Sequence, residues 1–155
     1  MKPKDRKVYE KEGRLVHKLM VQCFRSFGLS DSDISQKLAA IFEQVKSSNG
    51  AFQLIRIRDV VYTAGVTGKG QLELHALIGG QDKQDTAYRV EKLQNTLPNA
   101  LATVYQFGAE VVYCPMPKKE AVPYDETMEL FGFTKVDIPE EDGVKDMIVY
   151  VARLR

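Results

Sequence analysis

The chain has 155 residues, of which 44% are apolar and 28% charged; this balance is that of an ordinary folded protein and excludes a disordered or collagen-like chain. Because 22 Lys and Arg residues oppose 21 Asp and Glu residues, the net charge is only +1, and nucleic acid is not favoured as a partner. No apolar run approaches the roughly 18–20 residues of a membrane helix, and no signal-peptide stretch follows the basic N-terminus. We therefore expect a single domain over residues 1–155, cytoplasmic and without a membrane partner.

Two amphipathic helices are predicted in the first third of the chain. Apolar residues recur every three or four positions over residues 8–27 and again over residues 34–45. Gly28 is a suitable stop for the first helix, and Ser30 can cap the second. Gly13 weakens the first helix by about 1 kcal/mol relative to Ala, which leaves its start open.

Three strands are predicted next. Runs that are β-branched or that alternate apolar and polar residues cover positions 52–58, 60–66 and 71–78, with short turns between them. Consecutive strands with short connections pair as an antiparallel meander.

The second half alternates helix and strand. A helix should start at Asp85, and Pro98 should open a new helical segment because proline fits a first helical turn. A strand over 109–114 should end at Pro115-Met116-Pro117, followed by a helix over 124–130 and by two strands, 133–138 and 147–152, around the acidic turn 139–143. The predicted order is α-α-β-β-β-α-β-α-β-β, an α+β (α/β mixed-sheet) fold in which helices cover a central mixed β-sheet.

Two local patterns accompany this order. The segment Met128–Val136 reads MELFGFTKV, a helix that ends at a Gly before a strand, and the strand Leu72–Ile78 alternates before it stops at a Gly pair. Together with the element order, they resemble the GNAT superfamily of acyl-CoA-dependent N-acyltransferases. The resemblance implies a GNAT-like fold in which the strands Leu72–Ile78 and Val111–Cys114 splay apart. It also implies acetyl-CoA as cofactor, with its pantetheine arm between these strands, and transfer of an acetyl group to an amine substrate.

The resemblance also assigns roles to residues. Glu73 is the expected general base, which would deprotonate the amine directly or through water. The expected cofactor-binding backbone is that of Leu77, Ile78, Gly79, Gly80 and Gln81. A plainer interpretation stays open, in which Glu73 and His75 mark the solvent side of their strand and the Gly pair forms an ordinary turn.

Several features of the family are missing. Met128 stands where most members carry the Tyr that protonates the leaving thiolate, and Ala121 stands where they carry an Asn. Asp82 and Asp85 lie in the segment that should receive a pyrophosphate, and the family's first strand is absent. The alternative is a catalytically inactive GNAT-fold binding or structural protein, for example a bacteriophage virion or host-interaction component. Short, degenerate GNAT-like domains occur among bacteriophage-encoded proteins, and the divergence of this chain resembles theirs, which would place it in a virion. An unrelated α+β protein-binding module is a third interpretation.

The remaining chemistry-bearing residues favour ordinary roles. Cys23 and Cys114 are expected to be buried thiols, and two His and two Cys are too few for a dedicated metal site. The basic N-terminal segment and the acidic residues 140–142 form opposed patches, which could support contacts in a homo-oligomer or with a protein partner.

Overall fold

In the computed structural model, residues 3–138 and 146–154 are described, with side chains from residue 10 onward. The helices are α1 (Pro3–Ser26), α2 (Asp31–Ser47), α3 (Thr86–Gln106), α4 (Lys118–Ala121) and α5 (Asp125–Leu130), with a 3₁₀ turn, η1 (Val122–Tyr124), between the last two. The strands are β1 (Phe52–Ile57), β2 (Val60–Gly68), β3 (Gln71–Ile78), β4 (Val111–Pro117), β5 (Thr134–Ile138) and β6 (Met147–Arg153). The acidic turn 139–143 lies outside the described residues.

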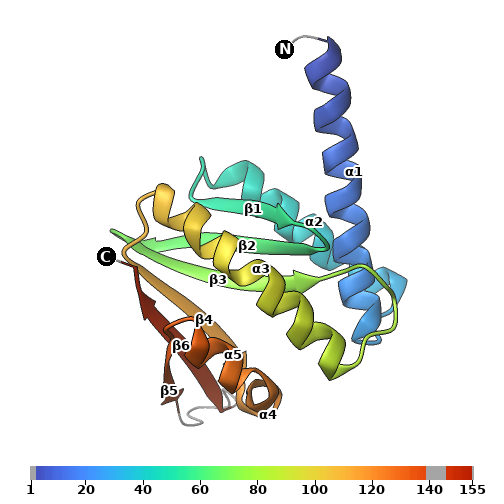
Figure 1. Cartoon of the computed structure of the whole chain (residues 1–155). Coiled ribbons are helices and arrows are strands. Elements are labelled where there is room, and N and C mark those ends of the chain that lie inside the picture. The colour runs from blue at the N-terminus through green and yellow to red at the C-terminus, as the bar shows by residue number, and fades with distance from the viewer. Residues whose placement is uncertain (1–2, 139–145, 155) are drawn as a thin grey trace.

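The strands form one mixed sheet with the order β1-β2-β3-β4-β6-β5 (Figure 1). β1, β2 and β3 make the predicted antiparallel meander, and β5 and β6 make the predicted hairpin partners. β3 and β4 run parallel because α3 carries the chain from one to the other. The structure therefore confirms the predicted α+β fold with a mixed central sheet.

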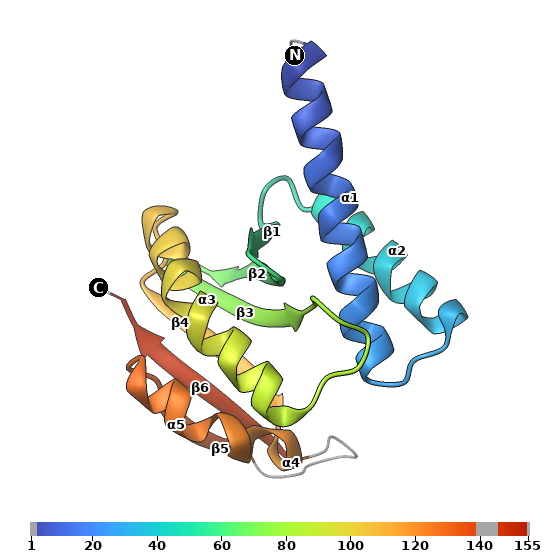
Figure 2. The ribbon, with the colours of Figure 1, turned by 45° about the vertical axis from the view of Figure 1, so that its right-hand side comes forward.

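Helices pack on both faces of the sheet (Figures 1 and 2). α1 and α2 contact one face of β1, β2 and β3, where a small apolar cluster surrounds Val61. α3 crosses the other face and contacts α5, and a larger core lies beneath it. The N-terminal half of α1 extends beyond the edge of the sheet (Figure 1).

The ends of the first two helices follow from local chemistry. Gly28 adopts a φ of +78° just after α1, a left-handed conformation that glycine adopts without a steric penalty. The Ser30 side chain accepts a hydrogen bond of 3.2 Å from the Asp33 N–H and caps α2 as predicted. α1 runs through Gly13 without a break.

The prediction that Pro98 opens a new segment is wrong. α3 is one helix that contains Pro98 in its interior. Pro98 is exposed, whereas Leu93, Leu97, Ala100 and Val104 form a single buried stripe that crosses it. The sheet holds this stripe on both sides of the proline, so tertiary packing overrides the local helix-breaking tendency.

Candidate functional site

β3 and β4 diverge soon after they meet. The register pairs only Gln71–Glu73 with Val111–Tyr113. Beyond these residues β3 continues to Ile78 along β2, and β4 continues to Pro117 along β6. The sheet therefore opens between the two strands, with the vertex of the opening at Glu73 and Tyr113. This is the splay that the resemblance implies.

Alternate residues of β3 present their backbone groups to the opening. The Gly70 carbonyl accepts the N–H of Val111 in β4 at 3.0 Å, whereas the Gly79 N–H donates to the Asp59 carbonyl, on the β2 side, at 2.8 Å. Successive residues of a strand point their N–H and C=O groups to opposite edges. Even-numbered residues of β3 therefore face the opening. Ala76 directs both of its backbone groups into the opening. Leu74 directs only its carbonyl there, because the pairing of Glu73 with Tyr113 places the Leu74 N–H on the Tyr113 carbonyl.

The opposite edge of the opening carries two prolines. The Lys118 N–H donates to the Asp146 carbonyl at 3.2 Å, which shows that even-numbered residues of β4 face β6. Pro115 and Pro117 consequently turn their ring nitrogens towards the opening. The prediction that these prolines end the strand is wrong because the edge they face has no partner strand there, so no ladder hydrogen bond is lost.

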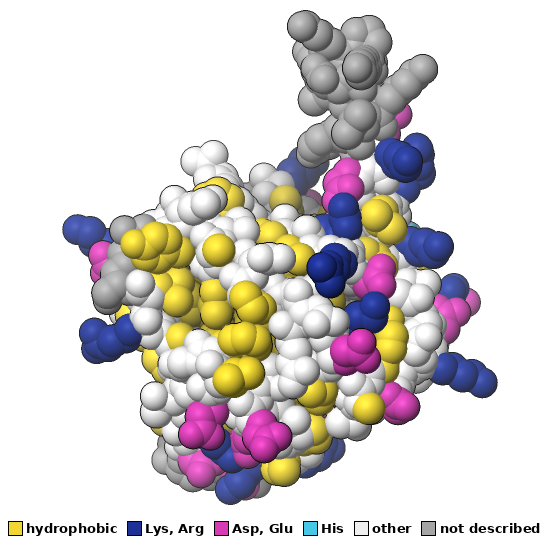
Figure 3. Space-filling model, in the orientation of Figure 1, with side chains coloured by type: hydrophobic (Ala, Val, Ile, Leu, Met, Phe, Trp, Pro, Cys, Tyr) yellow, Lys and Arg dark blue, Asp and Glu magenta, His cyan; other side chains and the backbone are white. Residues whose placement is uncertain are grey.

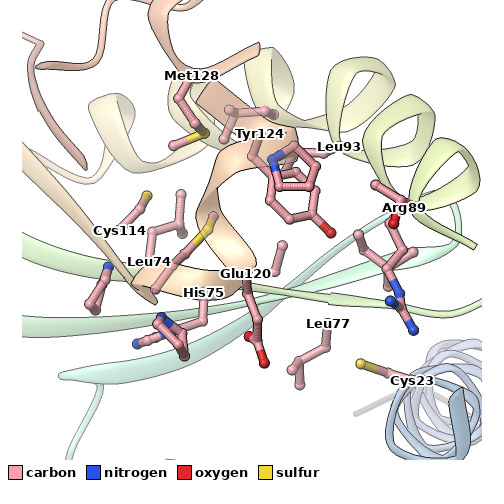
Figure 4. Close-up of a pocket in the computed structure, with 18 of the residues that line it drawn as sticks. Cys23, Leu74, His75, Leu77, Arg89, Leu93, Cys114, Glu120, Tyr124 and Met128 are labelled. Carbon is pink, nitrogen blue, oxygen red and sulfur yellow. The ribbon is translucent and has the colours of Figure 1, made fainter. Parts of the chain in front are cut away.

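A cavity of about 570 Å³ lies within the opening (Figure 4). Its walls come from β3 and β4, the first half of α3, the segment from α4 to α5, and the C-terminal end of α1. Figure 4 shows Cys114 and Met128 towards one end and Arg89 and Cys23 towards the other, with Glu120 between them. Most of the lining is apolar, which suits a slender ligand with few charges.

Arg89 supplies a positive charge at one end of the cavity. Its Nε lies 3.3 Å from Gln84 Oε1, and one terminal nitrogen lies 3.3 Å from the Ser26 carbonyl. The guanidinium carbon lies 4.3 Å from the centroid of the Phe27 ring. Among the described residues, no carboxylate forms an ion pair with Arg89. Its guanidinium is positioned by hydrogen bonds to uncharged groups.

Tyr124 is the half-buried phenol of the cavity. Burial raises the pKa of its hydroxyl above the ordinary value, while the nearby charge of Arg89 opposes this and Glu120 reinforces it. The hydroxyl is therefore protonated at neutral pH and can donate a proton. Tyr124 precedes Met128, the position of the family's proton donor, by four residues, about one helical turn.

Neither cysteine has the character of a nucleophile. Burial raises the pKa of the Cys23 thiol to about 11, although the Ile78 N–H and the charge of Arg89 oppose it. Burial likewise raises the pKa of Cys114 to about 12. Both residues are free, buried and protonated, which confirms the prediction of buried thiols.

The structure places Glu73 at the vertex of the opening. Its Oε1 lies 3.6 Å from Nε2 of His75, and the two side chains are 44% and 45% exposed. They lie on the face of β3 opposite to the buried Leu72 and Leu74. His75 lines the cavity and Glu73 lies beside it, so the pair borders the cavity from the open face of the sheet.

The backbone groups of Leu77 and Ile78 are already engaged. Leu77 pairs with Val61 of β2, although its side chain lines the cavity. The Ile78 N–H lies close enough to Cys23 to oppose the rise in its thiol pKa, and the Ile78 carbonyl accepts Nε2 of Gln84 at 2.7 Å. The open edge of β3 therefore consists of both backbone groups of Ala76, one position earlier in the alternation than Ile78, and of the Leu74 carbonyl, two positions earlier.

The loop after β3 does not form an anion nest at the cavity. Besides the Gly79 bond to Asp59, the Gly80 N–H donates to Oε1 of Gln22 at 2.8 Å. A Cβ at Gly79 would lie 2.7 Å from the Leu19 carbonyl oxygen, so this glycine lets α1 approach closely. The Gln81 carbonyl accepts Nε2 of Gln84 at 3.1 Å. The five predicted cofactor residues are adjacent in space but do not aim free N–H groups at one point.

The two positions where family side chains are missing are both buried. Ala121 and Met128 are 0% and 1% exposed. The Tyr150 hydroxyl, which donates to Asp125, lies 3.2 Å from the Ala121 carbonyl, so this backbone packs against the core. Neither position supplies a polar side chain to the cavity.

The comparisons with known proteins were made with both sequence and structure. The sequence matches no protein-family model, and the search of curated proteins found no significant match. By structure, the chain is similar to a protein of Desulfovibrio desulfuricans assigned to the GNAT family of acetyltransferases. The TM-score is 0.63 at 12% identity, over 90% of this chain and 92% of that one.

Two further solved structures agree. An aminoglycoside 6'-acetyltransferase type Ii superposes with a TM-score of 0.58 at 17% identity, over 92% of this chain and 89% of its own. The chain has the GNAT fold. A GNAT family acetyltransferase from Elizabethkingia anophelis, solved with acetyl-CoA bound, gives a TM-score of 0.50 at 12% identity, over 72% of this chain and 82% of that one.

The sequence did not single out Arg89, Glu120 and Tyr124. Tyr124 had one detectable signal, its position one turn before Met128 in the same helical segment. Residues 3–138 and 146–154 contain no group of three or more His, Cys, Asp or Glu side chains that could hold a metal ion. No helix in the described part of the chain is long and apolar enough to span a bilayer.

Proposed function

We propose that this chain is an acetyl-CoA-dependent N-acetyltransferase, which binds the acyl thioester between β3 and β4 and transfers the acetyl group to an amine. The observation that carries the proposal is the open edge of β3. The Leu74 carbonyl and the N–H and C=O groups of Ala76 point into a cavity of about 570 Å³, and a thioester arm with amide groups can pair with them as an added strand would.

The residues around the vertex have the chemistry that the reaction requires. A bound thioester would supply an activated acetyl carbon. The Ala76 N–H would polarise the thioester carbonyl oxygen. Glu73, directly or through water, would accept the proton of the attacking amine, and His75 would hold the carboxylate in place. The C–N bond forms, the C–S bond breaks, and Tyr124 would give its proton to the sulfur.

The first test is binding. Calorimetric titration with acetyl-CoA and CoA should show saturable binding, and both ligands should raise the melting temperature. At a ligand concentration of 100 times Kd, the free energy of unfolding should rise by about 2.7 kcal/mol. Absence of binding at millimolar concentrations would overturn the proposal.

The second test is turnover on a panel of amines, followed by release of the CoA thiol. Glu73→Gln should lower turnover by about 10²–10⁴-fold and leave acetyl-CoA binding unchanged, since the isosteric amide cannot accept the proton. A matched control is Glu43→Gln, an exposed position on α2 remote from the cavity, which should behave as the wild type. Equal activity of Glu73→Gln and wild type would remove Glu73 from the mechanism.

A second candidate function is a non-catalytic binding or structural role on the same fold. The engaged N–H groups of Gly79 and Gly80 favour it, because they are not available to a pyrophosphate. A protein partner, a second copy of the chain or a bacteriophage virion component would then replace the substrate. In that case Glu73→Gln and Tyr124→Phe would leave binding of the partner unchanged and would alter only the stability of the protein.

A further inference from the structure

We propose that this chain recognises its acyl donor through the pantetheine arm alone and has no binding site for the pyrophosphate of the CoA nucleotide. Acetylated pantetheine thioesters that lack a nucleotide would then be donors as good as acetyl-CoA. The inference rests on the proposed function, since it concerns the donor of the same site.

The loop between β3 and α3 is closed by its own contacts. The N–H groups of Gly79 and Gly80 bond to the Asp59 carbonyl and to Gln22. The Tyr88 hydroxyl donates to the Gly79 carbonyl at 2.7 Å, and a Cβ at Gly80 would lie 2.2 Å from that hydroxyl oxygen. Gly80 therefore accommodates Tyr88, and the loop is packed against neighbouring side chains at the place where a phosphate would approach.

The N-terminus of α3 is already capped by a carboxylate of the chain itself. Oδ1 of Asp85 accepts the Tyr88 N–H at 2.8 Å and caps the helix. This carboxylate meets the positive end of the helix dipole, so a second anion there would be repelled by it. A pyrophosphate would have to displace Asp85 or share the helix terminus with it.

Apart from Arg89 at the end of the cavity, the charges near this loop do not favour a polyanion. The surface hollow beside it is lined by Lys83, Asp85 and Glu91, with more acidic than basic groups. Nζ of Lys92 is paired with Oδ2 of Asp59 at 3.0 Å and is thereby neutralised. The loop lies beside the C-terminal end of α1 (Figure 1), and on that side Figure 3 shows Lys and Arg side chains interspersed with Asp and Glu side chains. Steering and binding of a nucleotide would gain little from this surface.

The inner part of the site has the opposite character. The Leu74 carbonyl and the backbone groups of Ala76 lie on the open edge, on residues about 6.6 Å apart along the strand, and can pair with amides of an extended arm. The edge stops at Ile78, whose carbonyl is covered by Gln84, and Arg89 stands at that end of the cavity. The site therefore suits an arm that ends near Arg89.

The inference is tested by competition on the whole chain. Calorimetry should give dissociation constants for acetyl-CoA and S-acetylpantetheine that agree within about tenfold, which corresponds to about 1.4 kcal/mol. ADP at millimolar concentration should not displace either thioester. A preference for acetyl-CoA above tenfold, or displacement by ADP, would overturn this inference and leave the proposed function standing. Failure of both thioesters to bind would overturn the two together.

A charge variant gives an independent readout. Ser caps a helix about as well as Asp, so Asp85→Ser should keep the fold while it removes the negative charge. The preference for acetyl-CoA over S-acetylpantetheine should then rise about threefold or more. Asp33→Ser, in the first turn of α2, is the matched control and should leave the ratio unchanged. An unchanged ratio in Asp85→Ser, or an equal rise in the control, would contradict the inference.

Discussion

A single proline substitution tests whether the Ala76 N–H faces an open edge. Ala76→Pro removes an N–H that points into the opening, so it should cost no ladder hydrogen bond. Leu77→Pro removes an N–H that points to Val61 of β2, a residue that is 0% exposed. The two substitutions are adjacent in sequence and delete the same group, but from opposite edges of the strand.

The magnitudes follow from these two environments. In Leu77→Pro the buried Val61 carbonyl loses its donor, which costs about 1–3 kcal/mol before the clash of the ring with β2 is added. In a domain of this size, a loss of about 2 kcal/mol lowers the melting temperature by about 4–8 °C. Ala76→Pro should stay within about 1 kcal/mol of the wild type, because Pro is tolerated on strand edges and restricts the unfolded chain.

The assay combines thermal unfolding with calorimetric titration of acetyl-CoA. Ala76→Pro should melt near the wild type and bind acetyl-CoA up to about tenfold more weakly, the equivalent of one lost hydrogen bond. Ala76→Gly, which keeps the N–H and loses the Cβ, should retain binding. If Ala76→Pro unfolds as readily as Leu77→Pro, the assignment of backbone edges is refuted. Unchanged binding by a folded Ala76→Pro would refute the use of this N–H by the ligand.

Three further predictions concern the cavity and its supports. Tyr124→Phe should lower kcat by about 10²–10⁴-fold with unchanged acetyl-CoA affinity, and an unchanged kcat in steady-state kinetics would exclude Tyr124 as the acid. Thr96→Val should cost about 1–3 kcal/mol in urea unfolding, because it strips the buried Tyr62 hydroxyl of its 2.9 Å partner, and adding Tyr62→Phe should recover part of this. The hydrogen bond from Tyr150, with Lys135, holds the pKa of Asp125 below its ordinary 3.8, so the stability it contributes is present above that pH and is lost as the pH falls through the lower folded-state pKa. Thermal melts between about pH 6 and pH 2 should show a smaller decline for Tyr150→Phe than for the wild type, and equal declines would contradict the coupling.

The sequence was sufficient for features that depend on neighbours along the chain. Gly28, Ser30 and the alternation of Leu72–Ile78 act within a few residues, and the structure confirms the elements they predict. The element order also led to the correct fold class, since a meander followed by a helix crossover leaves few ways to build a mixed sheet.

The errors arise where a distant contact decides the outcome. Pro98 stays in a helix because the sheet holds the buried stripe around it, and Pro115 and Pro117 stay in a strand because β3 has turned away. The state of the Gly79-Gly80 pair depends on Gln22, 58 residues earlier in the chain than Gly80. None of these contacts leaves a local pattern.

The same reason hides part of the candidate site. Tyr124 reaches the cavity only because a short 3₁₀ turn precedes α5, and Arg89 becomes part of it only through the end of α1. Glu73 could be named from a resemblance, but its position at the vertex follows from the three-residue pairing of β3 with β4.

The most direct test of the central claim is an NMR titration of the backbone amides with acetyl-CoA. The account predicts that the Ala76 amide resonance shifts most along β3, because its N–H meets the ligand. The His75 and Leu77 amides, which are bonded to β2, should shift less. Saturating acetyl-CoA that leaves the Ala76 amide unchanged would contradict the account.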